Sequence, residues 1–198
     1  MMLDRCIRRA RGFTIIELMV VAAIAAILIT TAVPSFAEFL SRRRVEGVMS
    51  ELVTDIHYTR YEAISRNARV RMTFGPRCYV IHLASATTAE CDGSAATLSK
   101  TIVPASAEIK TVQLDFGRPV SIDAASLAAS PSKPAYFEFD PVRGTAVNGA
   151  ASNAGLVDVR STTGRPWRLR AALTTMGRVT TCSPNGEGYF TGYSNSCS

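Results

Sequence analysis

A run of 21 residues, 13–33, is nearly all apolar and constrains the rest of the chain more than any other feature. As an α-helix at about 1.5 Å per residue it reaches roughly 32 Å, enough to cross the hydrocarbon core of a bilayer. It carries one formal charge, on Glu17, and a carboxylate is costly in that setting. Four arginines and one aspartate precede it in residues 1–12, which predicts that this end stays in the cytoplasm and the rest of the chain faces the other side.

The junction before the apolar run indicates how the chain is processed. A small residue, Gly12, stands between the basic segment and Phe13. A secretory signal peptide has its cleavage site after the apolar region, so cleavage at Gly12 would leave the hydrophobic helix on the mature protein.

Residues 12–18 read G-F-T-I-I-E-L, which resembles the G-F-T-L-x-E-L motif of type IV prepilins and type II secretion pseudopilins. The resemblance implies that prepilin peptidase cleaves between Gly12 and Phe13 and that Phe13 is then N-methylated. It also implies that Glu17 pairs with the terminal amine of a neighbouring subunit during assembly, and a buried carboxylate does need such a partner. Pro34 falls where these proteins commonly carry a helix-kinking proline. The alternative is a signal-anchor helix in which Glu17 occurs by chance.

The helical pattern continues beyond Pro34. Apolar residues recur at steps of three and four and predict one buried stripe, formed by Val45, Val48, Met49, Leu52, Val53, Ile56, Ala63 and Ile64. Asn67 is a plausible end of the helix. We therefore divide the chain into a leader (1–12), a transmembrane and assembly helix (13–34), an amphipathic continuation of that helix (35–67) and a β-rich globular domain (68–198).

Strand patterns dominate the remaining residues. Strands are expected over 68–74, 78–83, 108–116, 135–140, 156–160, 167–173 and 178–182. Loops are expected over 84–100, 122–134 and 148–153, with a Gly/Ser/Asn-rich tail over 183–198. The predicted fold is α+β, a long N-terminal helix packed on a mainly antiparallel β-domain.

Residues 57–67 narrow the resemblance. They are similar to the L-x-x-A-R-S-E-A-I-x-R-N signature of the GspH/FimT branch of minor pilins, with Tyr61 where that branch usually has Ser. The F-D-P stretch that begins at Phe139 is also similar, with Arg143 inserted before its glycine. The resemblance implies a minor pilin or pseudopilin whose partners are other major or minor pilins or pseudopilins, the peptidase and the inner membrane, with its globular domain in the periplasm. Initiation or capping of a type IV pilus and a place at the tip of a type II secretion pseudopilus both remain open.

Five cysteines are present, and Cys6 lies in the leader. Cys78, Cys91, Cys182 and Cys197 would face an oxidising compartment, which favours disulfides. Their proximity in sequence favours the pairs Cys78–Cys91 and Cys182–Cys197. A zinc site is the alternative, but the spacings fit no zinc signature.

Four arginines near the C-terminus suggest an anionic partner. Arg168 and Arg170 share one side of an expected strand, while Arg165 and Arg178 each follow a glycine at a strand end, and Trp167 lies among them. Such a patch can meet phosphates and stack on bases. Some members of this branch resemble DNA receptors with a C-terminal G-R-x-R motif, which the chain matches only in part. DNA is therefore a possible partner, and an exposed sheet face or a subunit contact is the alternative.

Composition gives little support for catalysis or for a cofactor. The formal net charge of +6 falls to +3 without the leader, whose four arginines and one aspartate contribute +3. The two histidines, His57 and His82, lie on an expected helix and an expected strand without motif neighbours, and no nucleotide-binding, hydrolase or metal-binding motif is evident. We expect no enzyme activity, no cofactor and no metal.

Overall fold

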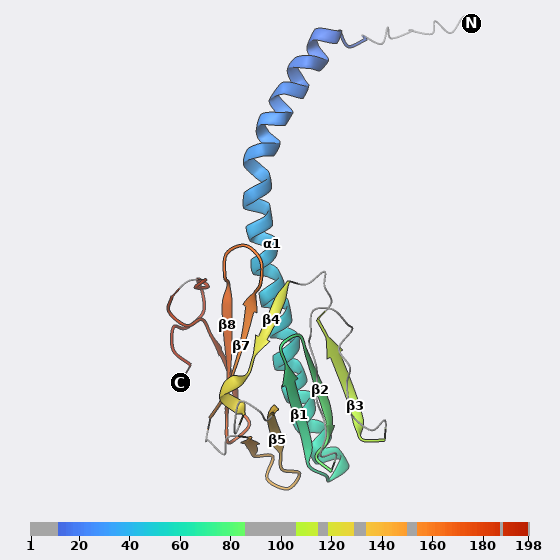
Figure 1. Cartoon of the computed structure of the whole chain (residues 1–198), viewed down its shortest axis with the longest axis vertical. Helices are drawn as coiled ribbons and strands as arrows, with labels where there is room; N and C mark the ends of the chain where they lie inside the picture. The colour runs from blue at the N-terminus through green and yellow to red at the C-terminus, as the bar shows by residue number, and fades with distance from the viewer. Residues whose placement is uncertain are drawn as a thin grey trace, which may run out of the picture. The chain divides into compact units, whose positions relative to one another are not determined.

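The structure is a computed structural model that describes residues 12–85, 106–114, 119–128, 134–149, 154–186 and 188–197. The chain divides into two compact units, with the boundary between Ala37 and Glu38. One helix, α1 (Ile15–Arg66), begins in the first unit and ends in the second (Figure 1).

The second unit combines the later half of α1 with two antiparallel sheets. Among the described residues one sheet has five strands in the order β3-β2-β1-β5-β6, and the other has four in the order β4-β7-β8-β9. The first contains β1 (Val70–Gly75), β2 (Cys78–Leu83), β3 (Glu108–Gln113), β5 (Ala135–Phe139) and β6 (Ala146–Asn148). The second contains β4 (Val120–Asp123), β7 (Ala154–Ser161), β8 (Arg168–Thr174) and β9 (Val179–Cys182). This arrangement confirms the α+β prediction.

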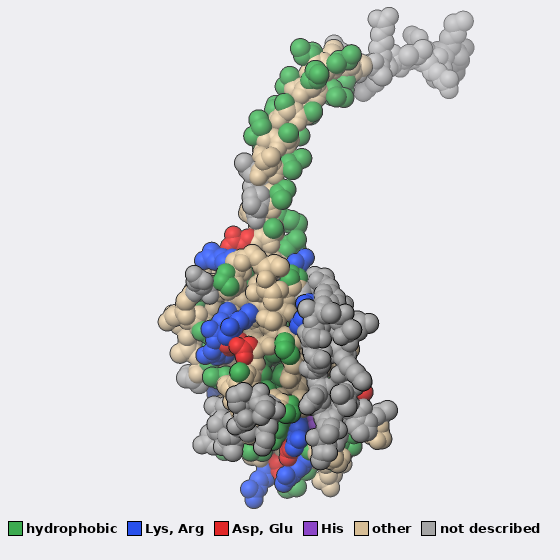
Figure 2. All heavy atoms as spheres, viewed as in Figure 1, with side chains coloured by type: hydrophobic (Ala, Val, Ile, Leu, Met, Phe, Trp, Pro, Cys, Tyr) green, Lys and Arg blue, Asp and Glu red, His purple; other side chains and the backbone are tan. Residues whose placement is uncertain are grey.

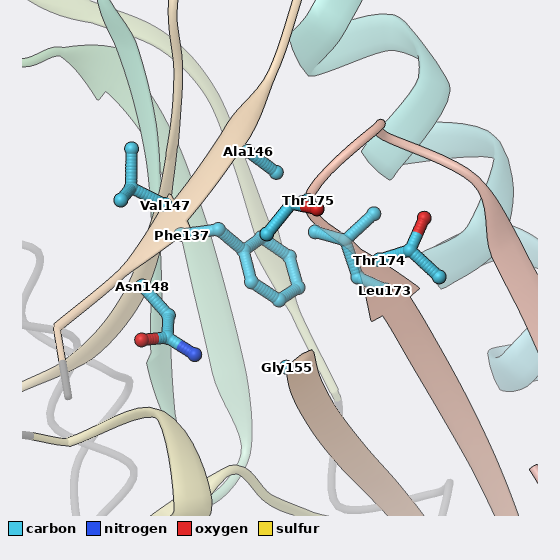
Figure 3. A pocket seen from close by; sticks show the side chains of 8 residues that line it. All are labelled: Phe137, Ala146, Val147, Asn148, Gly155, Leu173, Thr174 and Thr175. Carbon is cyan, nitrogen blue, oxygen red and sulfur yellow. The ribbon is translucent and has the colours of Figure 1, made fainter. Parts of the chain in front are cut away.

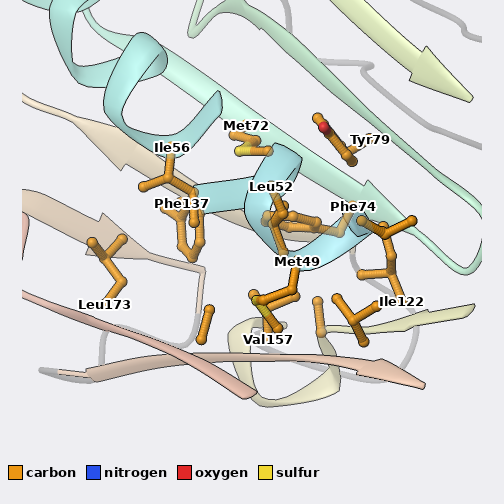
Figure 4. Close-up of a cluster of buried hydrophobic side chains, with 14 of the residues drawn as sticks. Met49, Leu52, Ile56, Met72, Phe74, Tyr79, Ile122, Phe137, Val157 and Leu173 are labelled. Atoms are coloured by element: carbon orange, nitrogen blue, oxygen red, sulfur yellow. The ribbon is translucent and has the colours of Figure 1, made fainter. Parts of the chain in front are cut away.

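A single hydrophobic core joins α1 to both sheets. Leu52 and Ile56 of the helix are fully buried, and the predicted apolar stripe supplies most of the helix's share of the core. Figure 4 shows these side chains beside Phe74 and Phe137 of the first sheet and Val157 of the second. Burying one such side chain contributes roughly 1.5–3 kcal/mol, so the later half of α1 is an integral part of the β-domain.

The C-terminal end of α1 is fixed by glycines in two turns. Arg60 lies against Gly144 and Gly177, which both have positive φ values of 61° and 76°. A Cβ at Gly144 would come within 3.0 Å of the Arg60 guanidinium, and one at Gly177 within 3.3 Å. Only glycine combines this backbone conformation with such close approach. Asn67, with φ 48°, ends the helix as predicted.

Most expected strands are present, and the differences have physical causes. The expected loop over 122–134 is wrong at its start, because Val120 and Ile122 alternate with polar residues, are buried, and form β4 against β7. A 3₁₀ helix, Ala125–Leu127, follows. The short strand β6 was not expected, since its three residues carry no pattern and form a strand by pairing with β5. Most of the expected loop over 84–100 lies outside the described residues.

Candidate functional site

The start of α1 shows the physical role of the amino-terminal motif. The backbone N–H of Glu17 donates to the hydroxyl of Thr14 at 3.3 Å, so Thr14 caps the helix. A carboxylate at this position also faces the positive end of the helix dipole. The T-x-x-E portion of the motif therefore sets where the helix begins. Gly12 and Phe13 lie just ahead of it, and both are exposed.

The first unit presents apolar side chains in every direction. Between residues 13 and 33, the large apolar side chains that the structure describes expose 53–81% of their surface (Figure 2). A helix that is apolar all round needs lipid or other apolar helices around it. By length and hydropathy, no single straight helix in the described ranges qualifies as a membrane span. The two parts of α1, Ile15–Thr30 and Ser35–Arg66, meet these two criteria only when they are taken together as a bent pair.

The arginine pair predicted on one strand face meets a buried carboxylate. Asp158 of β7 lies directly opposite Arg170 of β8. Arg170 donates to both carboxylate oxygens, from Nε at 2.6 Å and from Nη2 at 3.0 Å. Arg168 and Arg160 donate to Oδ2 of the same carboxylate. Arg168 and Arg170 therefore do share a face, but they serve an ion-pair cluster centred on Asp158.

The electrostatics of this cluster follow from its geometry. Burial acts to raise the pKa of Asp158, but the hydrogen bonds from Arg170 and Arg168 outweigh it, and the pKa is lowered. The same bond to Asp158 raises the pKa of Arg170. The carboxylate thus stays ionised and neutralises part of the positive charge on this face of β8.

The other two predicted arginines lie apart from this cluster. Arg165 precedes β8, where it pairs with Glu38 at 3.3 Å and lies over the Trp167 ring at 4.9 Å. Arg178 follows β8 and is exposed. A seven-residue strand spans roughly 20 Å, so the four arginines do not form one patch. DNA binding stays a prediction.

The sequence interpretation missed Asp158 and its third partner, Arg160, which also pairs with Asp123 at 3.0 Å. The signal was the alternation D-V-R in 158–160 facing R-L-R in 168–170, which becomes informative only once the strand register is known. The polar surface of the second sheet is therefore built from matched charges on neighbouring strands.

The cysteines divide between described and undescribed parts of the chain. Cys182 and Cys197 form a disulfide with their Cα atoms 5.4 Å apart, which is the pairing that their proximity favours. Cys78 is buried and disulfide-bonded. The predicted partner Cys91 lies outside the described residues.

The two histidines have ordinary structural settings. His57 is exposed on α1. His82 is buried, where its Nε2 lies 2.9 Å from the Thr73 hydroxyl and its Nδ1 lies 2.9 Å from the Leu83 carbonyl oxygen. Burial lowers the pKa of His82. Within the described ranges no three His, Cys, Asp or Glu side chains gather in a way that could hold a metal ion.

Two hollows lie among the described residues of the second unit, a small one between the sheets and a wider, charged one beside β1. A cavity between the two sheets, lined by Phe137, Gly155 and Leu173 among others, measures about 10 Å³, the space of roughly one water molecule (Figure 3). A groove of about 410 Å³ beside β1 contains Arg69 and Arg71, but both donate to Glu138. Glu138 thus occupies donors of both arginines, and a formal charge of +1 remains among these three side chains.

These features define a class of protein. An exposed apolar helix opens with a capped G-F-T-x-x-E-L motif, continues as an amphipathic helix, and packs on antiparallel sheets. Subunits of pilin-like fibres have this organisation. The match of residues 7–33 to the prokaryotic N-terminal methylation motif agrees with it and implies a membrane-anchored component of a pilus or pseudopilus.

The chain belongs to the GspH family. Residues 49–189 match the model of that family, described as type II transport protein GspH. Three type IV major fimbrial protein FimA sequences of Dichelobacter nodosus are each 49% identical to the chain over 41 residues, 21% of this chain and 26% of theirs. The chain thus spans about a quarter of the length of the curated relatives it matches. No solved structure matches it.

Proposed function

We propose that the protein is a minor pilin or pseudopilin that prepilin peptidase cleaves between Gly12 and Phe13 and N-methylates at Phe13. The cleaved subunit stays in the inner membrane as a single-pass protein, with its globular domain in the periplasm, until it enters a fibre. The observation that carries this proposal is the apolar helix surface of the first unit, interrupted by one charge at Glu17. Bundled helices of neighbouring subunits would bury that surface.

Glu17 is the proposed assembly contact. Once apolar helices surround it, its carboxylate needs a cationic partner, and cleavage supplies one in the new amine at Phe13 of a neighbouring subunit. Pro34, which lies within α1, is the proposed kink position of the helix.

The proposal is tested by separating processing from assembly. Replacing Gly12 by Leu should block cleavage, which mass spectrometry of the purified chain detects. Glu17→Gln should leave cleavage and methylation intact but remove the subunit from sheared fibres. Glu62→Gln is the matched control, because this carboxylate lies on the same helix outside the apolar stretch, where it pairs with Arg66. Normal incorporation of both Gly12→Leu and Glu17→Gln would refute the proposal.

Two fibre types fit this function. The match of residues 49–189 to the GspH family favours a place in a type II secretion pseudopilus, and the identity to the fimbrial proteins favours a type IV pilus. Deleting the gene and measuring both secretion and pilus-dependent motility in the same strain would distinguish the two. Loss of secretion alone assigns the chain to the pseudopilus, and loss of motility alone assigns it to the pilus.

A further inference from the structure

Arginines surround α1 where it enters the β-domain. Arg42, Arg43 and Arg44 follow one another on the helix, and Arg165 lies in the loop between β7 and β8. This loop is held at the same level of the helix, because the hydroxyl of Ser41 lies 2.8 Å from that of Ser161. With Phe39 and Trp167, these four arginines form a surface that we call the arginine collar. Figure 2 shows basic side chains on both sides of the helix at this pole of the second unit.

The collar keeps a net positive charge. Its acidic neighbours are Glu38, paired with Arg165, and Glu46, paired with Arg42 and Arg43. Four arginines against two carboxylates leave a formal charge of +2. Arg44 is exposed, and it forms no ion pair within the described ranges.

The ion pairs within the collar leave it open to another anion. The Arg43 side chain is 64% exposed and that of Arg165 is 58% exposed. Exposed pairs of this kind are weak, so a phosphate group can compete for their guanidinium donors.

Aromatic side chains complete the surface. Phe39 is exposed, and the Arg43 guanidinium lies 5.2 Å from the centre of its ring. Trp167 is buried among Arg42, Arg165 and Phe190, and among the described residues its indole N–H has no hydrogen-bond acceptor. Aromatic rings beside long basic side chains are typical of proteins at the polar region of a membrane.

The short distance along the chain between the collar and the apolar run indicates that its anion belongs to the membrane. Phe39 follows the last residue of the apolar run, Val33, by six residues, or about 9 Å of helix. The polar region of a bilayer extends some 5–8 Å beyond the hydrocarbon core on each side. Arginine side chains are long and carry their charge at the tip, so Arg43 and Arg44 can span the remaining distance to the lipid phosphates.

We propose that the arginine collar binds the phosphate groups of anionic phospholipids. This inference rests on the proposed function, because it requires the apolar helix to lie in the membrane before assembly. The collar then holds the base of the globular domain against the lipid surface. Entry into a fibre exchanges these lipid contacts for contacts with other subunits.

Trp167 is the only tryptophan in the chain, so its emission reports on the collar alone. We would place the full-length protein in zwitterionic detergent micelles and titrate it with dihexanoyl phosphatidylglycerol or dihexanoyl phosphatidylcholine. Only the anionic lipid should change the Trp167 emission in a saturable way. Arg43→Gln combined with Arg44→Gln should raise the half-saturating lipid concentration about 25-fold, since each arginine contributes about fivefold.

The matched control removes two other exposed arginines by Arg143→Gln combined with Arg178→Gln. It has the same net charge as the collar variant and should bind the lipid within about twofold of the unaltered chain. Equal responses to the two lipids, or equal weakening in both double variants, would overturn the proposal. Competition by millimolar inorganic phosphate would identify a free-anion site instead. If Glu17→Gln still abolishes incorporation while the collar variant binds lipid normally, only the collar inference fails.

Discussion

Replacing Asp158 by Asn tests the ion-pair cluster of the second sheet. The substitution keeps the size of the side chain but removes the charge that Arg160, Arg168 and Arg170 share. Breaking a fully buried ion pair by removing one partner costs about 3–5 kcal/mol. Asp158 is only 5% exposed, but the three arginines expose 27–41% of their side chains, so water compensates them in part. We therefore expect a loss of about 2–3 kcal/mol.

The assay is urea and thermal unfolding of the full-length chain in detergent, followed by circular dichroism. For a domain of this size the loss corresponds to a fall in Tm of roughly 5–10 °C. Asp123→Asn is the control, because it makes the same chemical change on the neighbouring strand β4, where the carboxylate is 43% exposed and pairs with Arg160. Its cost should stay below about 1 kcal/mol. Equal costs for the two variants would refute the role of burial in this reasoning.

Acid adds a second readout of the same cluster. The lowered pKa of Asp158 means that its contribution to stability is present above its ordinary pKa of 3.8 and is lost as the pH falls through the lower pKa of the folded state. Asp158→Asn should remove that part of the acid dependence.

The same variant also tests DNA binding, because it frees Arg168 and Arg170. A salt-sensitive DNA affinity that rises in Asp158→Asn would indicate that the carboxylate masks a phosphate-binding face.

Three further predictions concern other buried groups. Burial lowers the pKa of His82, so the contribution of neutral His82 to stability is present above the ordinary pKa of 6.5 and is lost as the pH falls below that value. The free energy of unfolding should change with pH by at most about 1.4 kcal/mol per pH unit. Unfolding measured across pH 5–7.5 should lose this pH dependence in His82→Gln but keep it in His57→Gln. Asp55→Asn should cost about 2–3 kcal/mol in urea unfolding, because it removes the charge of a buried carboxylate that accepts from Lys110. Glu38→Gln, in the exposed pair with Arg165, should cost less than about 1 kcal/mol. Cys197→Ser should cost about 3 kcal/mol relative to the oxidised chain and nothing relative to the reduced one, as thermal unfolding with and without reductant would show.

The sequence predicted the elements whose patterns are long. The helix repeats its apolar stripe over many turns, so its course to Arg66 followed from spacing alone. Short elements were harder, because β4 offers only Val120 and Ile122 as buried positions and β6 offers three residues. In both cases the neighbouring strand stabilises the element, and that partner is invisible in a single-sequence pattern.

The candidate site likewise contains parts that the sequence could predict and parts that it could not. The amino-terminal motif was recognisable because its parts are adjacent in the chain, and Thr14 and Glu17 act within one helical turn. The partner of Arg170 was not, because Asp158 lies 12 residues away and meets it only through the register of β7 and β8. A local motif can be found from sequence, whereas an ion pair across strands requires the fold.

This difference changes how the arginines should be interpreted. Arg168 and Arg170 look like phosphate ligands in the sequence, yet a buried carboxylate already takes their hydrogen bonds, and an added anion would have to displace it. In the sequence, Arg43 and Arg44 look like ordinary charged residues on a helix, yet they are exposed and belong to the net positive arginine collar. Because an unpaired or weakly paired arginine gives up less when it binds an anion, the arginine collar is the stronger anion site of the two. The number of arginines in a segment therefore says less about anion binding than the carboxylates that the fold places opposite them.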